Sequence, residues 1–107
     1  MASGPRAEKL AQSIRDASGK EGITVVLGPK LHAVRVTWGL PLFGIETPDD
    51  NVREELLQIT IRMIQEDDSR FRPSEDLTLR VSKFMGPSWT WHSGEWVTRE
   101  PTGPSDV

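Results

Sequence analysis

The sequence predicts an α+β fold in which two helices pack on one face of an antiparallel sheet of four or five strands. Two segments, 5–19 and 48–67, carry apolar residues at three- and four-residue spacing, which is typical of helices. Short β-branched or alternating segments lie between turns that contain Gly or Pro, which is typical of strands. The order α-β-β-α-β-β, with a further short strand, suits one sheet with both helices on the same side.

Composition indicates one small domain without metal or thiol chemistry. The chain has 107 residues, 36% of them hydrophobic, and no Cys. A chain of this size can bury its own core, and without Cys it has no disulfides, thiolate zinc sites or cysteine nucleophiles. Only two His residues are present, far apart in sequence, so we expect no metal and no cofactor. The predicted boundaries are a flexible start at 1–4, a domain at 5–99 and a disordered tail at 100–107.

The first half of the chain predicts a helix followed by a hairpin. Pro5 suits a first helical position, and small or apolar residues then recur up to Gly19. Residues 23–27 are β-branched, 28–30 form a turn, and 31–38 alternate, which together predict two paired strands.

A second helix is expected to follow an unusually apolar connector at 39–45. Thr47 is the predicted N-cap and Pro48 the first helical residue, with Asp49 and Asp50 near the positive end of the helix dipole. The helix should run to about Asp67.

The C-terminal third predicts a half-buried strand and a hairpin. Apolar and polar residues alternate over 76–84, and 88–92 and 95–98 flank a two-residue Ser93-Gly94 turn. This register places Trp91 opposite Trp96 and His92 opposite Glu95, with Trp89 on the face of Trp91.

The second helix is apolar over an arc of about 200° when each residue advances 100°. One sheet covers an arc of only about 100°. One interpretation is that the chain covers the rest itself. The other is that this surface, with two residues of the connector, binds a second copy, most simply as a homodimer. The residues nominated for self-association are Leu57, Ile61, Ile64, Leu42 and Phe43.

Three of the four Trp residues share one face of the predicted C-terminal hairpin. One interpretation is that their rings fill the core. The alternative is an exposed platform for a small ligand or a peptide, formed by Trp89, Trp91 and Trp96.

The charge of the chain argues against general nucleic-acid binding. The net charge is −3 and the pI is about 5.3, whereas nucleic-acid binding favours a basic surface. By count, residues 1–38 carry six bases and three acids, 39–76 four and ten, and 77–107 three and three. One interpretation of this asymmetry is two surfaces that simply face solvent. The other is that the basic start lies against the acidic middle, within one chain or between two. No apolar run approaches the ~18 residues of a membrane span, so a soluble protein, cytoplasmic or otherwise intracellular, is expected.

Familiar catalytic motifs are absent from the sequence, and we nominate no catalytic residue. The sequence lacks a nucleophile elbow, a P-loop, a dinucleotide-binding fingerprint and an H-E-x-x-H zinc motif. The leading hypothesis is therefore a non-enzymatic interaction or assembly protein that binds itself. A ligand- or peptide-binding module built on the Trp hairpin is the second hypothesis. The third is a small acid-base enzyme that uses His32 or His92.

Overall fold

The computed structural model describes residues 4–28, 30, 32–40, 49–83 and 86–99. The chain forms α1 (Pro5–Ser18), β1 (Ile23–Leu27), β2 (Val34–Leu40), α2 (Asp50–Asp67), α3 (Pro73–Asp76), β3 (Leu77–Lys83), β4 (Ser88–His92) and β5 (Glu95–Arg99). This confirms the predicted α+β class and element order, including the fifth strand, and adds the one-turn helix α3. Residues 1–3 and 100–107, where disordered ends were expected, lie outside the described residues.

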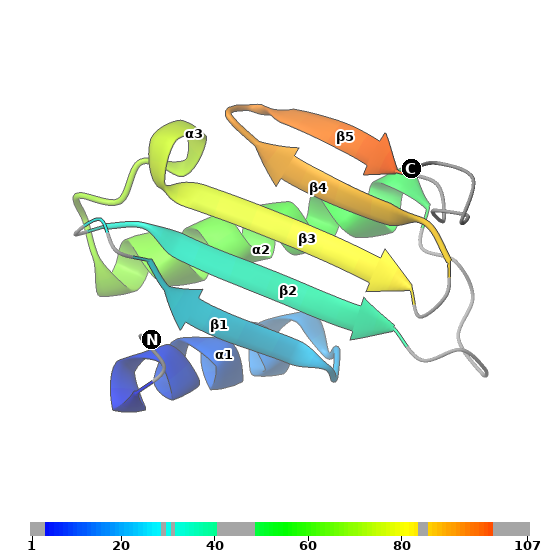
Figure 1. Ribbon diagram of the computed structural model, residues 1–107. Helices are drawn as coiled ribbons and strands as arrows, with labels where there is room; N and C mark the ends of the chain where they lie inside the picture. The colour runs from blue at the N-terminus through cyan, green and yellow to red at the C-terminus, as the bar shows by residue number, and fades with distance from the viewer. Residues whose placement is uncertain (1–3, 29, 31, 41–48, 84–85, 100–107) are drawn as a thin grey trace.

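The five strands form one mixed sheet in the order β1-β2-β3-β4-β5 (Figure 1). Neighbouring strands are antiparallel except β2 and β3, which are parallel, with Val34 opposite Leu77 and Leu40 opposite Lys83. The prediction of a wholly antiparallel sheet is therefore wrong for the central pair. The cause is α2, which returns the chain to the end of the sheet where β2 began, so that β3 runs in the same direction.

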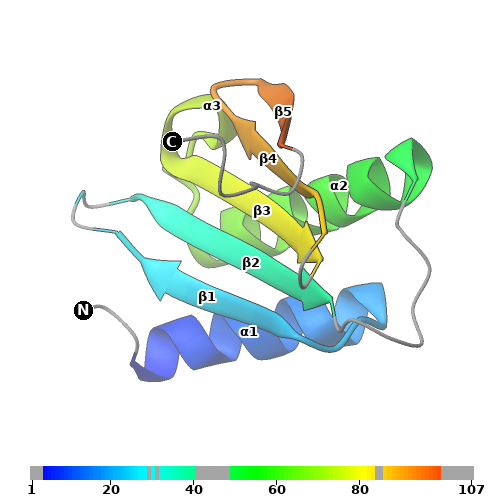
Figure 2. The same ribbon diagram turned by 45° about the vertical axis from the view of Figure 1, so that its right-hand side comes forward.

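Both long helices lie on the same face of the sheet, as the two views in Figures 1 and 2 show. Burial alternates along β2, β3 and β4, as expected for strands with one covered and one uncovered face. The core lies between this face and the helices, and its fully buried members include Ile14, Ile23, Val36, Leu56, Ile64, Leu79 and Val81. In the described part of the chain, neither long helix lies over the opposite face, and we call it the open face.

The largest boundary differences from the prediction are in β2 and at the start of α2, whereas β3 begins and β5 ends one residue later than expected. β2 covers Val34–Leu40, whereas the expected strand was 31–38, because Ala33 still belongs to the turn that closes against Gly28. The N-cap of α2 is Asp49, whose side chain accepts a hydrogen bond from the backbone N–H of Val52 at 2.9 Å. The predicted cap, Thr47, and Pro48 lie outside the described residues.

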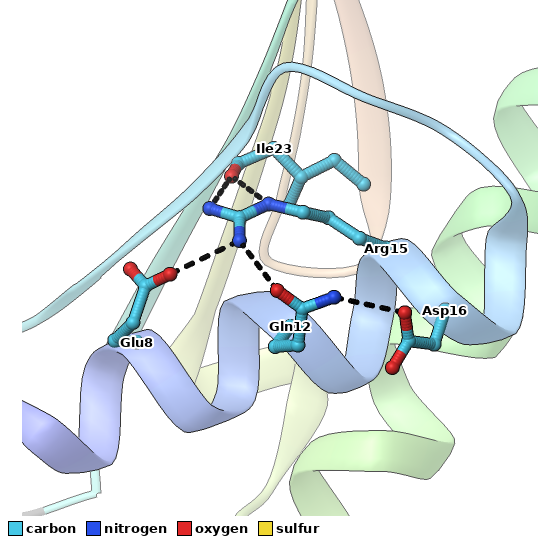
Figure 3. A network of polar contacts seen from close by, with 5 residues as sticks. All are labelled: Glu8, Gln12, Arg15, Asp16 and Ile23. Atoms are coloured by element: carbon cyan, nitrogen blue, oxygen red, sulfur yellow. Dashed lines mark hydrogen bonds and ion pairs between the residues drawn. The ribbon is translucent and has the colours of Figure 1, made fainter.

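Arg15 ties α1 to the edge strand β1 (Figure 3). Its guanidinium donates two hydrogen bonds to the carbonyl oxygen of Ile23, at 3.1 and 2.9 Å. It also donates to Glu8 at 3.0 Å and to Gln12 at 3.2 Å, and Gln12 donates to Asp16 at 2.8 Å. The planar fork of the Arg side chain thus satisfies a strand carbonyl and a helix carboxylate together.

Candidate functional site

The Trp hairpin forms in the predicted register, but its two N-terminal indole rings belong to the core. Trp91 pairs with Trp96 and His92 with Glu95. The turn residues Ser93 and Gly94 have φ angles of 53° and 87°, the positive values that a two-residue hairpin turn favours. Trp89 is only 7% exposed and Trp91 8%. Two of the three rings of the expected ligand platform are therefore buried.

Arg53 of α2 covers the indole rings from the helix side. Its guanidinium lies 4.6 Å from the ring centre of Trp89 and 5.9 Å from that of Trp96, and it also pairs with Asp50. Trp96 stays half-buried at the end of this stack. The cation–π contacts add to the stability of the hairpin, and they occupy the ring faces that a ligand would need.

The self-association surface predicted on α2 is largely buried within the chain itself. Leu57 is 3% exposed and Ile64 0%, and both belong to the core. Ile61 is half-buried at the margin of the helix. Leu42 and Phe43 lie outside the described residues. Of the residues nominated on the helix, only Ile61 reaches the surface.

The solvent side of α2 carries an open hollow of about 730 Å³. The hollow combines two half-buried isoleucines with charged and amide side chains: Glu55, Gln58, Ile59, Ile61, Arg62, Gln65 and Glu66. We call it the α2 hollow.

The open face of the sheet is polar and carries an excess of positive charge. It presents Arg35 on β2, Arg80 on β3 and Arg99 on β5, against the single carboxylate of Glu95 in β5. Within the part of the chain that the structure describes, none of these three Arg side chains has a hydrogen-bond or ion-pair partner. Most of the other side chains on this face are hydroxyls: Thr24, Thr37, Thr78, Ser82, Ser88 and Thr90.

A hollow of about 370 Å³ lies on the open face over β3, β4 and β5. It is lined by Arg80, Ser88, Thr90, Val97 and Arg99. Val97 is 51% exposed and is one of only two large hydrophobic side chains that are exposed among the described residues. We call this the β5 hollow. It places an apolar side chain beside two guanidinium groups.

His32 and Asp68 form a close pair that no pattern in the sequence indicated. His32 Nδ1 lies 2.5 Å from Asp68 Oδ2, and the backbone N–H of Arg70 donates to the other oxygen of Asp68 at 3.0 Å. These hydrogen bonds, that of His32 above all, hold the pKa of Asp68 below its ordinary value of 3.8. The residues are 36 positions apart and meet because the β1–β2 turn reaches the C-terminal end of α2.

The lowered pKa of Asp68 predicts a pH-dependent stability. The folded state favours the carboxylate, so this contribution is present above pH 3.8 and is lost as pH falls through the lower pKa of the folded chain. We expect Asp68→Asn to lower the urea midpoint of unfolding at neutral pH and to have less effect in acid. Urea titrations of both chains at several pH values measure this, with Glu21→Gln as a control for losing one exposed carboxylate. An Asp68→Asn effect that is equally large at all pH values would contradict the prediction.

Acidic residues at the two ends of α2 have partners within the fold, so their positions are explained by structural roles. Asp49 caps α2, and Asp67 pairs with Arg6 at 2.8 Å. Over the described ranges, no group of three or more His, Cys, Asp or Glu side chains is placed to hold a metal ion. Nor does any helix in those ranges have the length and apolar character to cross a membrane.

Comparison with known proteins yields no relative. No protein-family model matches the chain, and neither a curated protein nor a solved structure matches it.

Proposed function

We propose that this chain is a non-enzymatic protein that assembles with further copies of itself, the open face of one copy docking on the outer side of α2 of the next. The observation that carries the proposal is a separation of charge between two opposite sides of the molecule. The helices cover one face of the sheet, so the outer side of α2 and the open face point in opposite directions (Figure 2). Each copy can therefore present one surface to each of two neighbours.

The two surfaces carry opposite charge. The exposed charged residues of α2 are five acids and one base: Asp50, Glu54, Glu55, Glu66 and Asp67 against Arg62. The open face has the reverse balance, with three Arg residues and Glu95. Complementary potentials of this kind orient partners and speed their association.

The two hollows also match in chemistry. In the α2 hollow, Ile59 and Ile61 are accompanied by Glu55 and Glu66. In the β5 hollow, Val97 is accompanied by Arg80 and Arg99. Docking would bury an apolar side chain against two others while each guanidinium gains a carboxylate, which is the arrangement of an apolar centre within a polar rim.

The geometry favours an open or ring-shaped assembly over the twofold dimer predicted from the sequence. A twofold interface uses the same patch on both partners, whereas here each copy contributes a different patch. Ile61 is the one residue of the predicted self-association surface that stays in the proposed interface.

A different acidic partner, such as a nucleic acid, would also have to bind the open face. The described part of the open face lacks the indole and phenyl rings that nucleic-acid binding surfaces use. Neither Trp nor Phe lies on the described part of this face, so bases would have no ring on which to stack. The acidic chain as a whole also repels a polyanion.

Sedimentation equilibrium of the unmodified chain tests the proposal. At low ionic strength, the average mass should rise above the 12.0 kDa of one chain as concentration increases. The mass should fall again when salt is added, because salt screens exposed charges beyond about 10 Å at 0.1 M. A mass of one chain at all concentrations and at low salt would overturn the proposal.

A further inference from the structure

α3 and the β1–β2 turn lie at the same end of the sheet (Figure 1). A groove of about 470 Å³ lies there, beside the open face. It is separate in its lining from both hollows of the proposed assembly. Its walls come from β1, the β1–β2 turn, the start of β2, α3, and the ends of β3 and β4 that face α3: Val26, Leu27, Gly28, Lys30, Ala33, Val34, Arg35, Glu75, Asp76, Thr78 and His92. Its volume lies within the range of about 300–1,000 Å³ typical of small-molecule sites.

Four apolar residues line one part of the groove: Val26, Leu27, Ala33 and Val34. Val34 belongs to the core, Leu27 and Ala33 are half-buried, and Val26 is exposed to solvent. Val26 is 41% exposed, and with Val97 it makes up the exposed large hydrophobic side chains of the described chain. Exposed apolar area beside polar groups favours a ligand that has an apolar body.

The cations of the groove lack partners, whereas its carboxylates have them. Asp76 accepts a hydrogen bond from the backbone N–H of Arg72 at 2.8 Å, and Glu75 lies 3.7 Å from the Arg72 guanidinium. Across the described residues, neither the Lys30 nor the Arg35 side chain has a hydrogen-bond or ion-pair partner. Positive charge is thus the unmatched charge at this site.

Arg35 joins the apolar and the polar parts of the groove. It pairs with Val26 across β1 and β2, and with Thr78 across β2 and β3. Thr78 Oγ1 in turn lies 3.3 Å from His92 Nδ1. A carboxylate held by the Arg35 fork would lie beside a hydroxyl and an imidazole, while its apolar body covers Val26.

From this arrangement we infer that the groove binds a small amphipathic anion, a carboxylate with an apolar body. Guanidinium binds a carboxylate through two parallel hydrogen bonds, which fixes the orientation of the ligand. The apolar wall then selects against small inorganic anions, which offer nothing to bury there. The residues of this groove line neither hollow, but Arg35 lies on the open face that the proposed assembly would cover, so the site is tested at a concentration that keeps the chain a monomer.

Octanoate is a suitable probe for this site. It is titrated into the full chain, which is kept at low concentration, and binding is followed in ¹H–¹⁵N spectra. We expect saturable shifts centred on the amides of Ala33, Arg35 and Thr78, and affinity at least about tenfold weaker for 1-octanol, which lacks the charge. Arg35→Gln should weaken octanoate binding about tenfold, whereas the matched variant Arg99→Gln should leave it unchanged. The spectrum of each variant also reports whether the fold is retained.

Four results would overturn the inference. The first is that octanoate does not bind saturably, and the second is that 1-octanol binds as tightly as octanoate. The third is that Arg35→Gln and Arg99→Gln weaken octanoate binding to the same degree, because general surface charge would then account for the binding. The fourth is that inorganic phosphate displaces octanoate at an equal concentration, because the site would then bind anions without using its apolar part. If the unmodified chain binds octanoate but does not assemble, the result contradicts the proposed function and leaves the inferred site standing.

Discussion

Replacing Trp89 with alanine is expected to lower the free energy of unfolding by about 3–5 kcal/mol, the usual cost of removing a large buried aromatic ring. The ring is 7% exposed, pairs with Val81 of β3, and carries the Arg53 guanidinium at 4.6 Å. Its loss opens a cavity beneath α2 and leaves Arg53 without its main aromatic contact. Small domains are stable by only about 5–15 kcal/mol, so much of the total would be lost.

Urea unfolding measures this loss as a shift of the midpoint at constant slope. Thr98→Ala is the matched control, because Thr98 pairs with Trp89 across β4 and β5 but is exposed. The control should change stability by about 0.5 kcal/mol or less. Equal effects of the two substitutions would mean that Trp89 does not fill the core, and the ligand platform would again become a hypothesis.

Reversing the charge of either proposed surface is expected to abolish assembly. One variant combines Arg80→Glu with Arg99→Glu on the open face, and the other combines Glu55→Arg with Glu66→Arg on α2. Each places like charges across the interface, which should raise the dissociation constant at least about a hundredfold. All four side chains are exposed, so the fold itself should be little affected.

A control for charge alone combines Lys9→Glu with Arg70→Glu. Both residues are exposed and lie outside the two hollows, and the net charge changes as in the open-face variant. This control should assemble as the unmodified chain does. Loss of assembly in the control as well would show that net charge, and no particular surface, governs the association.

Local patterns predicted the elements well, because each depends on neighbouring residues. The Ser93-Gly94 turn fixed the hairpin register, and the spacing of apolar residues located α1. The parallel pairing of β2 with β3 joins strands that are separated by α2, and alternation within a strand does not report the direction of its neighbour. The helical crossover between them was the signal that could have revealed it.

The wide apolar arc of α2 is covered within the chain from two directions, because α2 contacts α1 as well as the sheet. Thr60 is 0% exposed and lies between Leu56 and Ile64 on the buried side of the helix. Its hydroxyl has no hydrogen-bond partner among the described residues. The sequence pattern gives the width of the apolar arc but not the neighbours that cover it, so tertiary packing determines which side of α2 is buried.

The charges of the open face could be read from the sequence only after the strands were aligned. Arg35, Arg80 and Arg99 are far apart along the chain and come together through the register of the sheet. The same holds for His32 and Asp68. Sites built across strands and turns depend on long-range pairing, which composition and periodicity do not encode.

Mixing the two charge-reversed variants tests the proposed assembly most directly. Sedimentation equilibrium should show one-chain mass for each variant alone, and a higher mass for the equimolar mixture at low salt. In the mixture, the acidic open face of one variant meets the basic α2 of the other, and the two native surfaces that remain also attract each other. A mixture that keeps the mass of a single chain, while the unmodified chain assembles, would contradict the proposed docking of the open face on α2.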